Sequence, residues 1–184
     1  APKSILAIVG AGHLVGMVPG FTTSPNQTRM GELMTKPPSS RMGYYIGWAI
    51  CAFILGMFYV GYQQSPELGW NLVVTWVLIN GGLSALGAAI ALAHPISILV
   101  AFFAAPLTSL NPTVGAGMMV GLVESYLRKP KVLDFERLRD DISSFPMWWK
   151  NGVVRVLLVF FFANVGSAVG TYVAGASIIQ QVLE

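Results

Sequence analysis

Four long stretches with almost no charge limit what this chain can fold into. They carry only two charged residues between them and comprise residues 43–62, 68–93, 96–127 and 153–179. A helix of about 20 apolar residues is long enough to cross the hydrocarbon core of a bilayer. The whole chain of 184 residues is only 10% charged, whereas soluble domains average about 25%. The sequence therefore predicts an all-α, polytopic membrane protein whose main partner is the lipid bilayer.

Three of the stretches are predicted to be transmembrane helices. Residues 43–62 have aromatic residues at both ends, which is typical of helices anchored at the two membrane interfaces. Residues 153–179 form the last span, in which Arg155 lies close enough to the end to reach the interface. Residues 68–93 carry a face of small residues suited to close helix packing in lipid. These small residues are Gly81, Gly82, Ser84, Ala85, Gly87 and Ala88.

The remaining stretch, residues 96–127, contains Pro106 and Pro112. A proline in a helix interior removes a backbone donor and costs about 3 kcal/mol, which argues against one straight span. If two legs meet at residues 109–112, each leg has about 15 residues and is about 22 Å long, shorter than a hydrocarbon core of about 30 Å. The sequence therefore predicts a re-entrant helical hairpin with Asn111 and Pro112 at its tip.

Basic residues are concentrated in two segments, which sets the expected orientation. Residues 21–42 hold three and residues 128–150 hold six, and such segments face the cytoplasm or its equivalent. We attribute the net charge of +3 to membrane topology and expect no nucleic-acid partner. Two spans and a returning hairpin between the segments keep both on one side, while a single crossing by residues 96–127 would separate them. Two complete short spans also satisfy this count, so that alternative stays open.

Within residues 128–150 we expect a helix that lies at the membrane interface. Its apolar residues recur at helical spacing, at Val132, Phe135, Leu138 and Ile142. Asp134 is the predicted N-cap of this helix, and Trp148 and Trp149 are expected at the level of the lipid headgroups.

The part of the chain before the first span has a different composition. Residues 5–9 are apolar and partly β-branched, and they predict a short buried strand that runs into a glycine turn at Gly10 and Gly12. Residues 21–42 are polar and rich in Pro, Ser and Thr, which is typical of a linker. We therefore expect a short strand-containing segment at 1–20, a linker at 21–42 and a membrane domain at 43–184.

Two stretches of the chain resemble a known protein family. They are "VGAGHLVGM" at residues 9–17 and residues 91–142, which include "AHPISILVAFFAAPLTSLNPTVGAGMMVGLVESYLRKP". Both resemble the C-terminal part of the TraB/PrgY family, the pheromone-shutdown proteins related to GumN and to the Tiki metalloproteases. The resemblance implies that a globular, metallopeptidase-like domain with two Gly-x-x-His motifs precedes the membrane region, with residues 1–20 as its remnant.

Gly10, Gly12 and His13 match the second of these motifs, so the resemblance makes His13 a candidate metal ligand. A catalytic divalent metal site commonly needs about three protein ligands, and the first motif of the family would lie upstream of Ala1. We therefore expect this chain alone to be non-catalytic. A divalent metal cofactor is implied only together with an upstream domain.

Four polar residues lie at or near the predicted membrane depth, where such side chains are costly and often functional. They are Asn80, Asn111, Glu124 and Asn164. Asn111 would satisfy backbone groups at the hairpin tip or line an ion or substrate pathway. Glu124 is the only acid in the hairpin, although an ion pair with Arg128, four residues on, is the simpler account. His94 is expected to mark a helix end at the interface.

A short sequence echo links the second and last spans. "SALG" at residues 84–87 and "SAVG" at residues 167–170 each follow an asparagine closely. Because the two spans run in opposite directions in the expected topology, the echo fits the trace of an inverted repeat, as found in transporters. Small-residue packing motifs also recur independently in membrane helices, and both explanations remain open.

Three functional hypotheses follow. The first is the membrane-anchoring half of a TraB-family protein, associated with a metal-dependent peptide hydrolase or with inhibition of a peptide signal, whose partner is an upstream catalytic domain or subunit. The alternative is a non-catalytic structural or accessory subunit of a larger membrane complex or homo-oligomer. A third is a small-solute pathway, which predicts a hydrated cavity that reaches Asn111. All three place the chain in a plasma or organellar membrane with residues 128–150 facing the cytoplasm or its equivalent.

Overall fold

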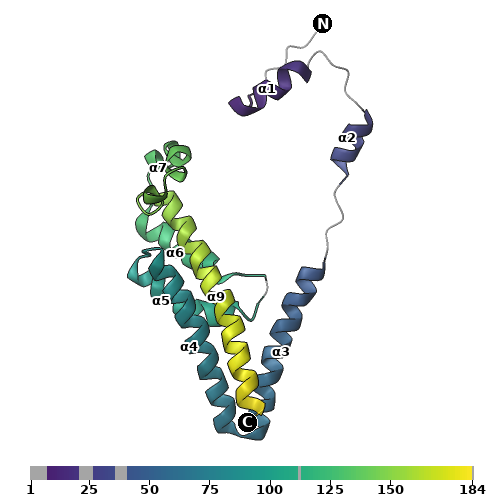
Figure 1. Ribbon diagram of the computed structural model, residues 1–184, viewed down its shortest axis with the longest axis vertical. Helices are drawn as coiled ribbons and strands as arrows, with labels where there is room; N and C mark the ends of the chain where they lie inside the picture. Colours follow the sequence, from purple (N-terminus) through teal and green to yellow (C-terminus); the bar gives the residue numbers. More distant parts are fainter. Residues whose placement is uncertain (1–7, 21–26, 36–40, 112, 184) are drawn as a thin grey trace. The chain divides into compact units, whose positions relative to one another are not determined.

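The structure is a computed structural model that describes residues 8–20, 27–35, 41–111 and 113–183. Within these ranges the regular elements are all helices and there is no strand, as the predicted all-α class requires. The chain divides into two units, Ala1–Ser40 and Arg41–Glu184 (Figure 1). Each unit is described by itself.

The first unit contains helices α1 (Ala11–Gly20) and α2 (Gln27–Met34). The predicted strand at 5–9 is wrong for Ile8 and Val9, which lie in no strand, and its remaining residues lie outside the described ranges. The N–H of His13 donates to the carbonyl of Gly10 at 2.9 Å. The glycine motif therefore forms the first turn of α1 instead of a turn at a strand end. Helix α2 falls within the segment predicted as a linker.

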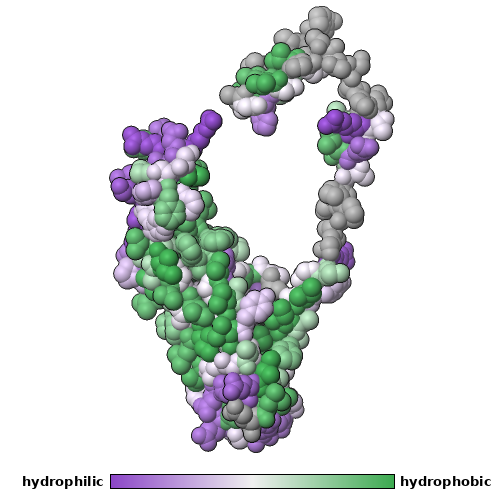
Figure 2. Space-filling view, in the orientation of Figure 1, coloured by the Kyte–Doolittle hydropathy of each residue, from purple (hydrophilic) through white to green (hydrophobic). Residues whose placement is uncertain are grey.

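Three long helices, α3 (Met42–Gln64), α4 (Pro66–Ile90) and α9 (Gly152–Leu183), are long and apolar enough to cross a membrane. They correspond to the three predicted spans. Ser65 sets the start of α4, because its side chain accepts a hydrogen bond from the N–H of Leu68 and Pro66 occupies the first helical position. Figure 2 shows apolar residues over the middle of the second unit and hydrophilic residues at its two ends.

Helices α4 and α9 run antiparallel and touch through their backbones. A Cβ added to Gly87 would overlap the carbonyl of Phe162, and one added to Gly166 would overlap the carbonyl of Leu83. Further along the same contact, a Cβ on Gly170 would lie 2.7 Å from the Cα of Asn80. The "SALG" and "SAVG" segments lie along this one seam. The small-residue face of α4 therefore packs closely against α9, in agreement with the close helix packing predicted from the sequence.

Helices α5 (Pro95–Thr108) and α6 (Ala116–Arg128) form a helical hairpin beside one half of α4 and α9 (Figure 1). The legs are about 21 Å and 20 Å long at 1.5 Å per residue. Pro106 lies inside α5 and does not end it, contrary to a simple proline break. Because Pro106 has no N–H, the carbonyl of Phe102 loses its helical donor, and this carbonyl faces Gly81 of α4. The predicted turn begins at Ser109, and Pro112 lies outside the described residues.

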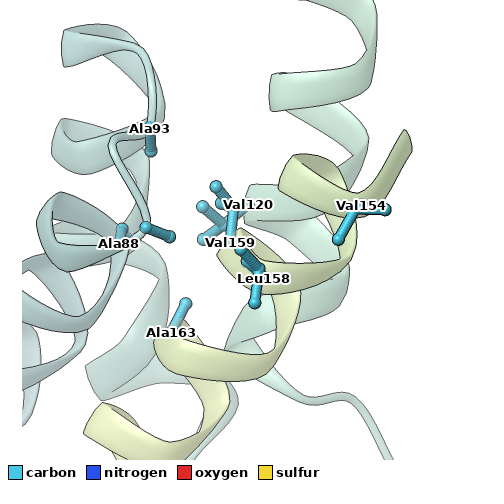
Figure 3. Close-up of a cluster of buried hydrophobic side chains, with 9 residues drawn as sticks. Ala88, Ala93, Val120, Val154, Leu158, Val159 and Ala163 are labelled. Atoms are coloured by element: carbon cyan, nitrogen blue, oxygen red, sulfur yellow. The ribbon is translucent and has the colours of Figure 1, made fainter. Parts of the chain in front are cut away.

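The apolar core nearest the hairpin is built mainly from small and branched side chains of α4, α5, α6 and α9. Figure 3 shows how they meet, and the labelled members are Ala88, Ala93, Val120, Val154, Leu158, Val159 and Ala163. A second cluster lies at the other end of the second unit and includes Ile54, Leu72, Trp76 and Ile178. Between the two clusters lies the tip of the hairpin.

The segment between α6 and α9 contains α7 (Val132–Glu136), α8 (Leu138–Ile142) and a short 3-10 helix, η1 (Phe145–Met147). The prediction of one continuous helix here is wrong, because the chain breaks between α7 and α8. Asp134 is not the N-cap; it lies inside α7, where its carboxylate accepts the N–H of Lys131 at 2.8 Å. Trp149 donates to the carbonyl of Ile90 and so satisfies the C-terminal end of α4 at 3.2 Å.

Arg41, the basic residue that begins the second unit, lies at the same end of this unit as the basic segment at 128–150. Helix α3 runs antiparallel to α4, since Gly61 contacts Leu72 and Gly69 contacts Tyr62 across their junction. Helix α9 is also antiparallel to α4, so α3 and α9 begin at a common end. Arg41 precedes α3 and Lys150 precedes α9 at this end. The C-terminus of α9 lies at the opposite end with the α3–α4 turn.

Candidate functional site

A network of polar side chains joins the hairpin to both long helices. The hydroxyl of Ser109, just after α5, lies 3.0 Å from Oδ1 of Asn80 on α4 and 2.8 Å from Oγ of Ser167 on α9. Ser167 also reaches Oδ1 of Asn80 at 3.2 Å, and Nδ2 of Asn80 donates to the hydroxyl of Thr171 at 3.0 Å. Asn80 is completely buried. Its amide is therefore paired on both sides, as buried polar groups require.

The network lies halfway along the long helices. Ser167 is at the midpoint of α9, and Asn80 is slightly past the middle of α4. The hairpin enters from the basic end and turns where it meets these residues. Each leg is therefore about half as long as its long neighbour, and the turn sits beside the centre of the apolar region.

Asn164 of α9 supports the second leg of the hairpin. Its Oδ1 accepts the N–H of Gly117 at 2.9 Å, in the first turn of α6. The residue at the N-cap position, Gly115, has no side chain to supply this acceptor. A Cβ at Gly117 would overlap the carbonyl of Phe160, so only glycine permits this approach. The asparagine of one helix thus caps another that is far away in sequence.

Asn111 lies in the turn itself and is exposed. Its Oδ1 accepts the N–H of Thr113 at 3.0 Å and the hydroxyl of Thr113 at 2.6 Å. This is an Asx-type turn, in which a side chain replaces a backbone partner. The geometry agrees with the predicted structural role of Asn111, and the predicted pathway role remains untested.

A cavity with a volume of about 220 Å³ adjoins the network, between the hairpin turn and α9. Its lining residues come from the end of α5, the turn, the start of α6 and the middle of α9. They are Thr108, Ser109, Asn111, Val114, Gly115, Ala116, Asn164, Ser167, Ala168 and Thr171. Two of the predicted polar residues, Asn111 and Asn164, therefore share one cavity. Asn80 lies behind it and orients Ser109 and Ser167.

Glu124 lies at the other end of the hairpin, away from this cavity. Its side chain is fully buried, and Oε1 lies 3.0 Å from Nε of Arg128, so the predicted ion pair is confirmed. Oε2 accepts the N–H of His94 at 2.8 Å. His94 in turn caps α5, since its Nδ1 accepts the N–H of Ile96 at 3.2 Å. Glu124 thereby joins the end of α6 to the start of α5.

Asn151 is a structural residue that the sequence reasoning missed. It is buried, and its Oδ1 accepts the N–H groups of Val153 and Val154 at 2.9 and 3.1 Å, which caps the start of α9. Its Nδ2 donates to the carbonyl of Asp134 and to a carboxylate oxygen of Asp141, each at 2.8 Å. An asparagine directly before a long apolar run is the available sequence signal for such a cap.

Comparison with known proteins places these features in a family. A model of the TraB family protein, C-terminal domain, matches residues 42–183, which include all three long helices and the hairpin. The chain belongs to the TraB family. An uncharacterized protein of Methanocaldococcus jannaschii is 33% identical over 179 residues, an alignment that covers 92% of this chain and 45% of that relative. The chain thus spans less than half of the relative's length. No solved structure matches it.

The metal site implied by the TraB resemblance can be tested against the residues of this chain. His13 is exposed in the first turn of α1. Within residues 8–20, 27–35, 41–111 and 113–183, no three His, Cys, Asp or Glu side chains gather closely enough to hold a metal ion. The described residues therefore do not form a divalent metal centre by themselves, and we derive no catalytic step from them.

Proposed function

We propose that this chain is the membrane-anchoring part of a TraB-family protein, with three transmembrane helices and a re-entrant hairpin. The observation that carries the proposal is the apolar surface of α3, α4 and α9 between two polar ends (Figure 2). Large apolar side chains of these helices and of the hairpin face outward, among them Leu78, Leu86, Phe103, Leu122 and Phe161. So many exposed large apolar side chains are unusual for a soluble monomer, and lipid is the solvent that suits them.

The re-entrant path is favoured over two complete short spans by leg length. Legs of about 20 Å fall short of a hydrocarbon core of about 30 Å. The turn contacts the midpoint of α9 and would therefore lie near the centre of the bilayer. Non-helical backbone at this depth is tolerated where protein buries it or where it lines a water-filled cavity, and the network around Asn80 and the adjoining cavity supply both conditions.

The orientation follows from the charged end. We place the end that carries Arg41 and the segment at 128–150 in the cytoplasm or its equivalent, by the positive-inside rule. The α7–α8 segment then lies at that interface, with Trp148 and Trp149 at headgroup level. Because α3 begins at this end, whatever precedes residue 41 is also attached on the cytoplasmic side.

The finer part of the proposal concerns what is anchored. By the family resemblance, the anchor holds a metal-dependent peptide hydrolase, or an inhibitor of a peptide signal, close to the membrane surface. The described residues do not by themselves gather a ligand set, so His13 would share the metal with ligands from outside the described ranges. This chain's own contribution is then to position the soluble part, not to perform chemistry.

One observation favours the alternative of an accessory subunit in a larger assembly. Helix α3 buries only Cys51, Ile54 and Gly61, and its first turns expose Tyr44, Tyr45 and Trp48. A membrane helix with so few buried residues has an exposed surface that a partner protein could contact. Both functions share the same anchor, and they differ in whether a stoichiometric partner copurifies in mild detergent.

The topology is testable with single cysteines in a Cys51→Ala background, since Cys51 is the chain's one cysteine. We expect Ser143→Cys to react with a membrane-impermeant maleimide only from the cytoplasmic side of sealed vesicles. Gln63→Cys, at the end of α3, should react only from the opposite side. Labelling of both from one side, or release of the protein by alkaline carbonate, would refute the anchor.

The hydrolase association needs the full-length protein. His13→Ala should lower its bound divalent metal, measured by elemental mass spectrometry, and its cleavage of a peptide library. His94→Ala is the control, because His94 caps α5 and should leave the metal content unchanged. Equal metal content and cleavage in wild type and His13→Ala would exclude His13 as a ligand while leaving the anchor intact.

A further inference from the structure

The cavity at the hairpin turn has an unusual lining for a site beside the centre of an apolar region. It is lined by four residues that carry hydroxyl groups, Thr108, Ser109, Ser167 and Thr171, and by Asn111 and Asn164, together with small apolar residues. These groups come from segments that are far apart in the sequence. No lining residue carries a charge. The cavity is therefore mixed in polarity and electrically neutral.

The turn beside the cavity is partly exposed. Asn111 and Thr113 are exposed, and residues 109–111 and 113–115 lie outside the two helices of the hairpin. The N–H groups of Asn111, Thr113 and Val114 have partners within the chain, but a turn carbonyl that faced acyl chains without a partner would cost several kcal/mol. Water or a polar ligand against the turn removes that cost. The cavity supplies the space for it.

We propose that this cavity is a hydrated binding site for a small, uncharged, hydrogen-bonding molecule such as a primary amide. The proposal rests on the membrane placement argued above and goes beyond anchoring. A volume of about 220 Å³ corresponds to roughly seven water molecules at about 30 Å³ each. It therefore admits a few waters or one small solute.

The chemistry of the lining selects a neutral ligand. An ion brought to this depth without a counter-charge would meet a severe desolvation penalty, and the lining offers no counter-charge. The N–H of Gly117, which would otherwise face an anion at the start of α6, is already bonded to Asn164. Nδ2 of Asn164 forms no hydrogen bond with any residue that the structure describes, so it is available as a donor to a carbonyl oxygen.

Two neighbouring residues of α9 give a matched test of hydration. Ala168 lines the cavity, whereas Val169 is 47% exposed and does not line it. Adjacent residues differ in depth by only about 1.5 Å. Ala168→Cys and Val169→Cys would each be made in Cys51→Ala and reconstituted in liposomes, with Gln63→Cys as the water-exposed reference. The probe is 2-hydroxyethyl methanethiosulfonate, which is small, polar and uncharged and reacts with thiolates in water.

We expect Ala168→Cys to react at least tenfold faster than Val169→Cys, and at a rate closer to that of Gln63→Cys. If both α9 cysteines are slow while Gln63→Cys is fast, the cavity is dry and the proposal fails, but the membrane anchor stands. If all three react at similar fast rates, α9 is not embedded in lipid, and the anchor itself is refuted.

Ligand binding is tested by protecting Ala168→Cys with acetamide and with acetate, which have similar shapes but differ in charge. We expect acetamide to slow the modification of Ala168→Cys in a saturable way and to leave Gln63→Cys unchanged. Acetate should protect neither. Protection by acetate as well as acetamide would contradict the selection of neutral ligands. If acetamide gives no protection, the cavity is not a binding site for this class of ligand, even if it is hydrated.

Discussion

Helices α4 and α9 make a tight seam, whereas α3 is loosely packed, although the three helices are similarly apolar. The mean hydropathy of their most apolar windows is 1.6 for α3, 1.7 for α4 and 2.0 for α9. The seam is built by Gly87, Gly166 and Gly170, each of which has backbone of the facing helix where a Cβ would be. A Cβ at Gly43 or Gly56 of α3 would meet nothing within 4 Å. How tightly two helices pack in this protein therefore depends on whether small residues lie at their contact. The hydropathy of a helix alone does not predict it.

The largest effect is expected at the seam, for Gly166→Ala. The added methyl group would collide with the carbonyl of Leu83 and lie 2.9 Å from the Cα of Ser84. Backbone atoms cannot relieve this clash by changing rotamer, as a side chain can. The helices α4 and α9 must therefore move apart. We expect a loss of about 3 kcal/mol in unfolding free energy, at the upper end for overpacked cores. The measurement is SDS-induced unfolding in mixed micelles followed by circular dichroism.

An unchanged transition for Gly166→Ala would show that the seam can open without cost. Gly87→Ala, which approaches the carbonyl of Phe162 further along the same contact, should behave alike. A large effect at only one of the two positions would mean that the seam is tight at one point and not along its length.

The second effect concerns the base of the hairpin. Glu124→Ala removes the buried acceptor of the His94 N–H and the partner of Arg128. A donor left without its partner costs about 1–3 kcal/mol, and the side chain of Arg128 is 28% exposed and so partly solvated. We expect a loss of about 2 kcal/mol in the same unfolding assay. Glu124→Gln retains an acceptor for His94 and should lose less, so equal losses would show that the ion pair alone matters.

Both ends of the hairpin show what the sequence could and could not predict. The turn at Ser109, the short legs and the Glu124–Arg128 pair follow from proline chemistry, helix length and four-residue spacing, all of which are local. The bond from Asn164 to Gly117 joins residues 47 positions apart. No local rule pairs such residues, because the contact exists only once α6 lies against α9.

Two wrong predictions elsewhere in the chain have a similar origin. Residues 5–9 have the β-branched composition of a strand, yet Ile8 and Val9, the two described residues of this segment, lie in none, because a strand needs a partner strand and the described residues offer none. Asp134 follows the residue preference of an N-cap, yet its carboxylate reaches back to Lys131 from inside α7. Propensity thus identified the right residue for capping and misplaced the helix start.

A smaller effect is expected where α4 meets α5. Trp76 donates its indole N–H to the carbonyl of Pro106 at 3.0 Å. Trp76→Phe keeps an aromatic ring in the core and removes this one hydrogen bond. Since hydrogen bonds between membrane helices average about 0.6 kcal/mol, we expect a loss of about 1 kcal/mol or less, measured by SDS unfolding. A loss as large as that of Gly166→Ala would mean that the ring, and not the bond, dominates.

The smallest effect sharpens the opening comparison most directly, because it repeats the seam substitution on the loosely packed helix. Gly56→Ala in α3 places its methyl group in open space, and alanine is favoured over glycine in helices by up to about 1 kcal/mol in water. We expect an unfolding free energy equal to or slightly above that of the wild type. If Gly56→Ala leaves stability in detergent unchanged but disrupts a complex isolated from native membranes, this position of α3 contacts a partner protein. That result would favour the accessory-subunit function over an isolated anchor.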